Sequence, residues 1–188
     1  MSVTFNDKYT RHVGSVTTST NTTTGGVTHS SGGVILPGSY IARRSISSAI
    51  TDSVGQGVAE STLASITIPT NTLGINDGLE INILWSCTNT DAVKRLRGKF
   101  GGVVVWNFDL TTQLGFRQNF ILRNRNSQSS QVAQANSSTS FAPVGSVGIQ
   151  TFTVNFSLEQ VLTFTGQFPL AGTGLNTMSI EEYSVKVI

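Results

Sequence analysis

From Glu60 to Ile188, apolar side chains recur at every second position, and this alternation constrains the fold more than any other feature. Between residues 79 and 87, one parity reads Leu, Ile, Ile, Trp, Cys and the other reads Glu, Asn, Leu, Ser. Successive side chains of a strand point to opposite faces of the sheet, so this pattern predicts strands with one buried face. No stretch has helical spacing over three turns. The sequence therefore predicts an all-β chain.

Local turn signals divide residues 60–188 into eight or nine expected strands. Asn-Asp-Gly at 76–78 is the clearest turn, and the change of parity at 181–182 predicts a β-bulge in the last strand. Residues 127–140, rich in Ser, Gln and Asn, predict a weak edge strand. The apolar positions expected to face inward include Leu63, Ile66, Ile68, Leu96, Phe100, Phe116, Phe120, Leu122, Phe152, Val154, Phe156, Leu162, Phe164, Phe168, Met178, Ile180, Tyr183, Val185 and Val187.

Short strands separated by turns are typical of a sandwich or a barrel. Two long, irregular crossings are expected at 69–78 and 136–148. They favour an antiparallel, jelly-roll-like sandwich over a simple meander.

Residues 1–59 differ from the rest of the chain in composition. Ser, Thr, Asn and Gly fill 17–26 and 30–33 almost completely, and no strand or helix period runs through this part. Ordering a backbone costs about 1–2 kcal/mol per residue, which so few apolar side chains cannot offset alone. We therefore expect 1–59 to be an extended, mostly irregular arm and 60–188 to be the β-sandwich domain. The arm is either a disordered tail or a segment held by a partner surface.

Charge is sparse and unevenly placed. Charged residues make up 12% of the chain, with 12 basic and 10 acidic residues for a net charge of +2. Seven basic residues fall between 94 and 125, namely Lys94, Arg95, Arg97, Lys99, Arg117, Arg123 and Arg125. Aromatic residues alternate with them on the opposite, inward parity rather than among them, which argues against a nucleic-acid surface. The cluster predicts a solvated outer sheet or a subunit interface.

No constellation of residues points to catalysis, a cofactor or a metal. Both histidines, His12 and His29, lie in the expected arm, and Cys87 closes an inward-facing row as a buried structural thiol. The carboxylates do not converge by spacing, so a glycosidase pair is not expected. No apolar run is long enough to span a membrane, and no secretory leader is visible at the N-terminus. The expectation is a non-enzymatic protein without cofactors.

One segment resembles a known protein family. Residues 65–79 read Ser-Ile-Thr-Ile-Pro-Thr-Asn-Thr-Leu-Gly-Ile-Asn-Asp-Gly-Leu, and Lys-Phe-Gly-Gly follows at 99–102. Arg-Asn-Arg at 123–125 and the bulged last strand at 179–187 complete the pattern. It resembles a jelly-roll module of tailed-phage virion proteins, found in fibres, spikes and capsid decorations. The resemblance covers roughly 60–188 and implies a homotrimer; the arm matches no known pattern.

Together these points favour a trimeric capsid decoration (cement) protein of a bacteriophage that stabilises the shell through its arm. Its partners would be itself and the major capsid protein or another virion protein, and its location the virion, assembled in the host cytoplasm. The alternative is a fibre or spike subunit that binds a host receptor or glycan, with Trp106 or Tyr183 stacking on the sugar. The expected partner contacts are Val34, Ile35, Leu36, Tyr40, Ile41, Arg43 and Arg44.

Overall fold

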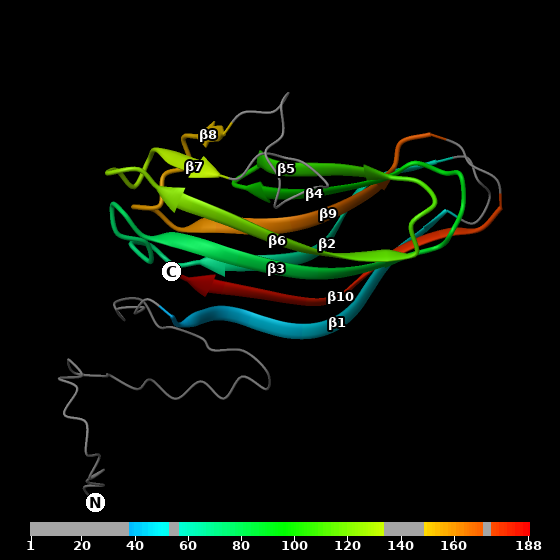
Figure 1. Ribbon diagram of the computed structural model, residues 1–188, viewed down its shortest axis with the longest axis horizontal. Coiled ribbons are helices and arrows are strands. Elements are labelled where there is room, and N and C mark those ends of the chain that lie inside the picture. The colour runs from blue at the N-terminus through cyan, green and yellow to red at the C-terminus, as the bar shows by residue number, and fades with distance from the viewer. Residues whose placement is uncertain (1–37, 53–56, 134–148, 171–173) are drawn as a thin grey trace, which may run out of the picture.

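The computed structural model describes residues 38–52, 57–133, 149–170 and 174–188, and within them every regular element is a strand (Figure 1). The all-β prediction is confirmed. The ten strands are β1 (Tyr40–Asp52), β2 (Val58–Ile68), β3 (Gly78–Cys87), β4 (Lys94–Phe100), β5 (Val103–Leu110), β6 (Gly115–Asn124), β7 (Gln131–Ala133), β8 (Gln150–Phe152), β9 (Gln160–Phe168) and β10 (Asn176–Val187).

The strands form two antiparallel sheets that pack face to face. The six-stranded sheet has the order β1-β10-β3-β6-β7-β8, and the four-stranded sheet has the order β2-β9-β4-β5. Only the connections β4–β5, β6–β7 and β7–β8 join hydrogen-bonded neighbours, so the chain otherwise crosses from one sheet to the other. Both layers are visible in Figure 1. This interleaving makes the sandwich one unit rather than two separable halves.

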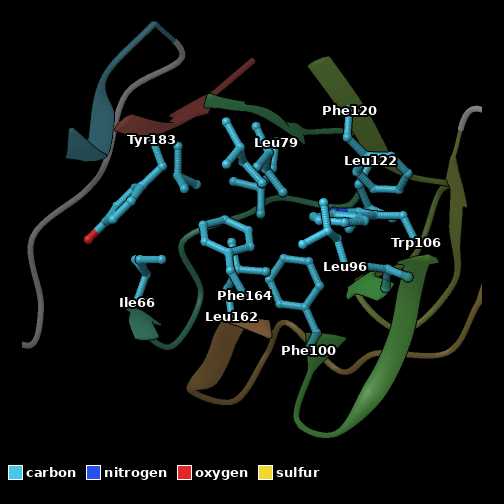
Figure 2. Close-up of a cluster of buried hydrophobic side chains, with 14 of the residues drawn as sticks. Ile66, Leu79, Leu96, Phe100, Trp106, Phe120, Leu122, Leu162, Phe164 and Tyr183 are labelled. Carbon is cyan, nitrogen blue, oxygen red and sulfur yellow. The ribbon is translucent and has the colours of Figure 1, made fainter. Parts of the chain in front are cut away.

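The core lies between the two sheets and uses the residues that the alternation selects. Figure 2 shows Leu79 and Tyr183 from the six-stranded sheet facing Leu162 and Phe164 from the four-stranded sheet. The Phe164 and Tyr183 rings meet edge-on, with centroids 5.7 Å apart. Such contacts between aromatic rings add to the burial of apolar area that stabilises the sandwich.

A glycine on the inner face of β4 makes room for a tryptophan of the neighbouring strand. Gly98 lies opposite Trp106 of β5, and a Cβ at Gly98 would stand 2.3 Å from Trp106 Nε1. No side chain fits there, so the indole lies directly on the backbone of β4. It also reaches the opposite sheet, where the Trp85 ring stands edge-on with centroids 6.2 Å apart.

Several details of the expected strands are confirmed. The register of β10 against β3 shifts between Ile180 and Glu182, which is the bulge that the parity change predicts. Gly101 and Gly102 both adopt positive φ in the turn between β4 and β5, a backbone conformation that favours glycine. The alternation of buried and exposed positions is regular along β3 and β4.

The largest correction concerns the expected arm. Residues 40–52, which were expected to be mostly irregular, form β1, which pairs with β10 at the edge of the six-stranded sheet. The register of β1 shifts between Tyr40 and Ala42 and again between Ser45 and Ser48. These two irregularities interrupt the alternation of inward and outward side chains, so the sequence of this strand shows no period of two. Residues 1–37 lie outside the described residues.

Two smaller corrections concern the β6–β9 region. The expected edge strand at 127–140 is the three-residue β7, which is paired on both sides, so β8 takes the edge instead. The row Phe152, Val154 and Phe156 is not one strand, because β8 ends at Phe152 while Val154 and Phe156 are buried in the loop that follows. The crossing expected at 136–148 falls entirely outside the described residues.

Candidate functional site

The expected contact residues divide into three groups. Val34, Ile35 and Leu36 lie outside the described residues. Ile41 is 6% exposed and belongs to the core of the sandwich, so its side chain already has intramolecular partners. The other three, Tyr40, Arg43 and Arg44, are exposed on β1.

Tyr40 and Arg43 form a pair at the beginning of β1. The guanidinium carbon of Arg43 stands 5.9 Å from the centroid of the Tyr40 ring, and the ring remains 41% exposed. The register shift after Tyr40 places both side chains on the same face, because Tyr40 lies opposite Lys186 and Arg43 opposite Ser184. An exposed arginine over an exposed aromatic ring combines two residue types enriched in protein interfaces.

The basic cluster at 94–125 is not one surface. Arg95, Arg97 and Lys99 lie on the outer face of the four-stranded sheet, whereas Arg117 and Arg123 lie on the outer face of the six-stranded sheet. Lys94 is fully buried. The two outer faces of the sandwich must therefore be considered separately.

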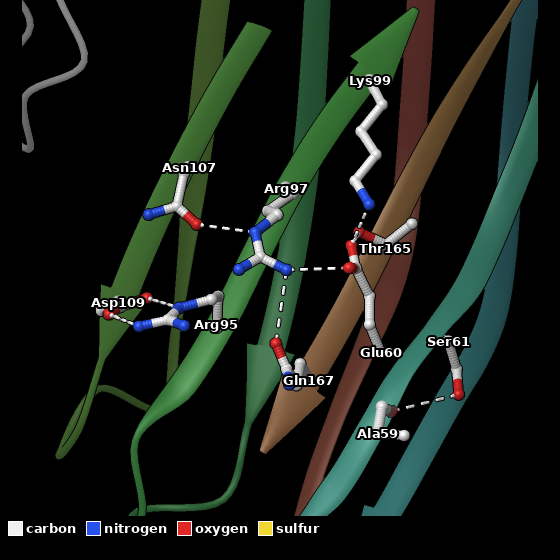
Figure 3. A network of polar contacts seen from close by, with 10 residues as sticks. All are labelled: Ala59, Glu60, Ser61, Arg95, Arg97, Lys99, Asn107, Asp109, Thr165 and Gln167. Carbon is white, nitrogen blue, oxygen red and sulfur yellow. Dashed lines mark hydrogen bonds and ion pairs between the residues drawn. The ribbon is translucent and has the colours of Figure 1, made fainter. Parts of the chain in front are cut away.

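On the four-stranded sheet, Glu60 is the centre of a polar network (Figure 3). Its carboxylate accepts Lys99 Nζ at 2.6 Å and Arg97 Nη1 at 2.8 Å, and the Thr165 hydroxyl donates to it at 2.5 Å. Partial burial alone would raise the pKa of Glu60, but the hydrogen bonds from Lys99 and Thr165 and the nearby cations lower it below its ordinary value. The carboxylate is therefore held in its charged form.

The remaining cation of that face is also paired. Arg95 binds Asp109 through two parallel hydrogen bonds, Nε to Oδ1 and Nη2 to Oδ2, each 2.7 Å long. This fork lowers the pKa of Asp109. Arg97 also donates to Asn107 and Gln167 on the two neighbouring strands. All three cations of β4 that point outward are thus held by other strands of the same sheet.

The outer face of the six-stranded sheet is arranged differently. Asn119 donates to Asn82 at 2.8 Å and, like Asn82, to Oε1 of Glu80 at 3.2 Å. Lys186 lies opposite Glu80 in the register but forms no ion pair with it or with any other described residue. The one ion pair recorded on this face joins Arg117 to Glu182 at 3.6 Å. Hydrogen bonds from the Asn119 amide, to Asn82 and to the Glu80 carboxylate, are thus the main side-chain links between β3 and β6 on this face.

Unpaired cations collect at one end of this face. Apart from the buried Lys94, five basic side chains of the described residues form no ion pair, and these are Arg43, Arg44, Arg123, Arg125 and Lys186. β1 begins, and β6 and β10 end, at the same end of the sheet, because β1 is antiparallel to β10 and β3 is antiparallel to both β10 and β6. We call Arg43, Lys186 and Arg123, with Tyr40 and Ile121 beside them, the cationic face.

Lys94 belongs to the basic cluster expected on an outer sheet or at an interface, and the structure corrects this expectation because its side chain is buried. Its ammonium group donates to the backbone carbonyls of Thr90, Ala92 and Thr111, and so ties the β3–β4 loop to the β5–β6 loop. Burial lowers the pKa of Lys94 and raises that of Cys87 to about 11, so Cys87 is a neutral thiol, as the sequence predicts. The alternation along β4 could have predicted this burial, since Lys94 lies two residues before Leu96 and six before Phe100, both of which face inward.

Both aromatic residues considered for stacking on a sugar are core residues. Trp106 is 1% exposed and Tyr183 is 5% exposed. Among the described residues, no group of three or more His, Cys, Asp or Glu side chains could hold a metal ion. The described part of the chain also contains no helix that is long and apolar enough to cross a membrane.

Comparison with known proteins yields only distant likenesses. No protein-family model and no curated protein matches the chain. Among solved structures, insecticidal delta-endotoxin Cry8Ea1 from Bacillus thuringiensis aligns with 74% of this chain and 19% of its own, at 11% identity and a TM-score of 0.36. The CBM2 module of the evolved Dit of Lactobacillus casei BL23 phage J-1 aligns with 65% of this chain and 68% of its own, at 15% identity and a TM-score of 0.36.

A third solved structure is similar at the same level. Dimeric latent PorU from Porphyromonas gingivalis aligns with 88% of this chain and 14% of its own, at 10% identity and a TM-score of 0.33. At these identities and TM-scores, the function of none of the three proteins transfers to this chain.

Proposed function

We propose that this chain is a non-enzymatic virion structural protein, a trimeric capsid decoration protein that stabilises the shell through its N-terminal residues. The sequence pattern at 65–79 supports a phage origin. The strand order supports a jelly roll, because β1-β10-β3-β6 and β2-β9-β4-β5 are two interleaved four-stranded sets. In this assignment the β7–β8 hairpin is an addition to one edge of the jelly roll.

One structural observation carries the proposal more than any other. Residues 1–37 lead directly into β1, a 13-residue strand at the edge of the six-stranded sheet. Two backbone hydrogen bonds fix the point of entry, from Gly38 N to Val187 O at 2.7 Å and from Val187 N to Ser39 O at 2.9 Å. A Ser/Thr-rich segment attached to an edge strand is well placed to pair with strands of a neighbouring subunit.

The proposed mechanism is attachment by several weak contacts. Backbone pairing and small apolar anchors at Val34, Ile35 and Leu36 would give each arm a modest affinity. A trimer presents three arms, so the binding of one arm raises the effective concentration of the others. Repeated over symmetry-related sites, these contacts would oppose the separation of shell subunits under internal pressure.

The alternative is a fibre or spike subunit that binds a host receptor or glycan. It needs an exposed aromatic or polar groove, and Tyr40 is the only aromatic side chain that is largely exposed among the described residues. The two candidates differ in copy number. Hundreds of copies per purified particle would support decoration, and a few dozen or fewer would support a fibre or spike.

Deletion of residues 1–37 tests the proposal. The shortened chain keeps β1 and should remain a folded sandwich, with unchanged β-type circular dichroism. It should lose binding to particles assembled without this protein. Decorated particles should also survive heating better than undecorated ones. Full binding by the shortened chain, or equal survival of both particles, would contradict the decoration role.

A further inference from the structure

The two outer faces of the sandwich differ in how their cations are neutralised. On the four-stranded sheet, Arg95, Arg97 and Lys99 are bound by Asp109 and Glu60 from neighbouring strands. On the cationic face, Arg43, Lys186 and Arg123 form no ion pair with a described residue. Three positive side chains lie around one carboxylate there, that of Glu80. The excess positive charge is available to a partner.

The side chains of the cationic face point away from the core. Lys186 alternates with buried Val185 and Val187, and Arg123 alternates with buried Leu122. Two partly exposed apolar side chains lie in the same row across the sheet, Tyr40 on β1 (41%) and Ile121 on β6 (38%). Arginine, tyrosine and isoleucine around neutral amides make a surface suited to specific contact rather than to general solvation.

A second copy of the chain does not fit this surface. Glu60, Asp109 and Glu182 are already ion-paired, and Asp52 is buried. The other described carboxylates, Asp77, Glu80, Asp91, Glu159 and Glu181, lie on five different segments of the chain. The described surface of a second copy therefore offers no matching acidic patch.

A nucleic-acid backbone also fits poorly. Glu80 lies on β3, between Lys186 on β10 and the strand that carries Arg123, and would repel a phosphate backbone that passed between them. Oε1 of Glu80 accepts two amide donors, from Asn82 and Asn119. The charge pattern is complementary to separate carboxylates that flank a hydrogen-bond donor, as on a folded protein surface.

We propose that the cationic face docks on an acidic surface of a different protein, with Arg43, Lys186 and Arg123 binding its carboxylates and Tyr40 and Ile121 packing at their sides. This deepens the proposed function and rests on it, because Gly38, the first described residue, lies next to Val187 at the same end of the sheet and the virion partner of the arm would be the protein that the face contacts. The segment and the cationic face then act as one bivalent attachment.

The first test measures retention of the full-length protein on immobilised poly-L-glutamate at low ionic strength. Arg123→Gln should bind about tenfold more weakly than the wild type, and Arg43→Gln combined with Lys186→Gln should bind more weakly still. Arg117→Gln is the matched control, since Arg117 lies on the same strand and face but outside the cationic face. It should stay within about twofold of the wild type, and Arg123→Lys should keep its retention.

Three results would overturn the proposal. They are no retention of the wild type, an equal loss for Arg117→Gln and Arg123→Gln, or tighter retention on immobilised duplex DNA with the same ranking of variants. The last result would assign the face to a phosphate polymer. Thermal melting by circular dichroism checks that each variant is folded, and the double variant Arg43→Gln with Lys186→Gln replaces Arg123→Gln as the test if the latter melts early.

The second test uses particles assembled without this protein. If the full chain binds them, Arg123→Gln should weaken that binding and Arg117→Gln should not. Equal binding by both variants would overturn the proposed role of the cationic face in attachment. If the full chain does not bind particles at all, the decoration function fails, while the ranking on poly-L-glutamate still decides whether the face recognises carboxylates.

Discussion

The outer faces of the two sheets carry similar numbers of cations but use them differently. On the four-stranded sheet, each outward cation of β4 is bound by side chains of β2, β5 or β9, so the charges join strands of one sheet. On the six-stranded sheet, amide side chains join β3 to β6, and every cation of the cationic face is left without an ion pair, whereas Arg117 pairs loosely with Glu182. The comparison suggests that one face contributes to stability and the other to recognition, and four predictions test that division.

The largest effect on the free energy of unfolding is expected for the buried Lys94. This buried ammonium donates to three backbone carbonyls, whereas Lys99 on the same strand points outward and shares Glu60 with Arg97. Replacing Lys94 by Met leaves three backbone carbonyls, one buried and two partly buried, without this donor and should lower the free energy of unfolding by about 2–4 kcal/mol. Lys99→Met should cost about 1 kcal/mol or less, since Arg97 still neutralises Glu60. Urea unfolding of both variants measures the difference.

A similar cost for Lys94→Met and Lys99→Met would contradict this account of β4. It would mean that water replaces the lost donor at the loop carbonyls.

Glu60→Gln should have the second-largest effect. The substitution removes the negative charge that Arg97 and Lys99 share and leaves these two cations as like charges without a counter-ion, although an amide oxygen can still accept from Thr165. The expected loss is about 1–2 kcal/mol in the free energy of unfolding. Glu80→Gln on the other sheet is the matched control and should change stability by less than about 0.5 kcal/mol, because an amide oxygen still accepts from Asn82 and Asn119. Equal losses would erase the contrast between the faces.

The sequence predicts part of this difference between the two outer faces, because the period-two pattern of apolar residues indicates which face of a sheet each side chain occupies. It correctly places Arg95, Arg97 and Lys99 on one outer face and Leu96 and Phe100 in the core. It also locates the bulge near Glu181, because a bulge changes parity visibly. Whether a residue stands at an odd or an even position of a strand indicates which face of the sheet its side chain points to. The same rule correctly places Lys94 on the inner face of β4.

The alternation cannot predict pairing across strands, because that depends on register between distant segments. Glu60 meets Arg97 only because β9 brings β2 and β4 together in one sheet. β1 was missed for a related reason, since its two register shifts remove the period while its pairing with β10 keeps it a strand. The free cations of the six-stranded sheet could not be told from the bound ones before this arrangement was known.

Acid should destabilise the protein mainly through the four-stranded sheet. The pKa values of Glu60 and Asp109 are lowered in the folded state, so both carboxylates stabilise the fold above their unfolded-state pKa, and this stability is lost as pH falls through the folded-state values. The loss should begin below about pH 4.5 and remain modest, because both groups are partly exposed and screened by solvent. Melting temperature as a function of pH measures it.

The double variant Glu60→Gln with Asp109→Asn is the control for this pH dependence. It should start less stable at neutral pH and lose less stability between pH 5 and 3. A slope as steep as that of the wild type would place the acid-sensitive groups elsewhere.

The smallest effect on stability is expected for the cationic face, and this prediction defines the comparison most sharply. Arg43, Lys186 and Arg123 form no ion pairs with described residues, so replacing all three by Gln removes mutual repulsion and breaks no recorded salt bridge. The free energy of unfolding should stay within about 0.5 kcal/mol of the wild type or rise slightly, with the largest rise at low salt where screening is weakest. Urea unfolding at low and high ionic strength tests this, with Arg95→Gln as the control that breaks a fork and should lose stability at low salt. A loss for the triple variant equal to that of the control would show that these cations hold the fold together, and the division between a stabilising face and a recognising face would then be wrong.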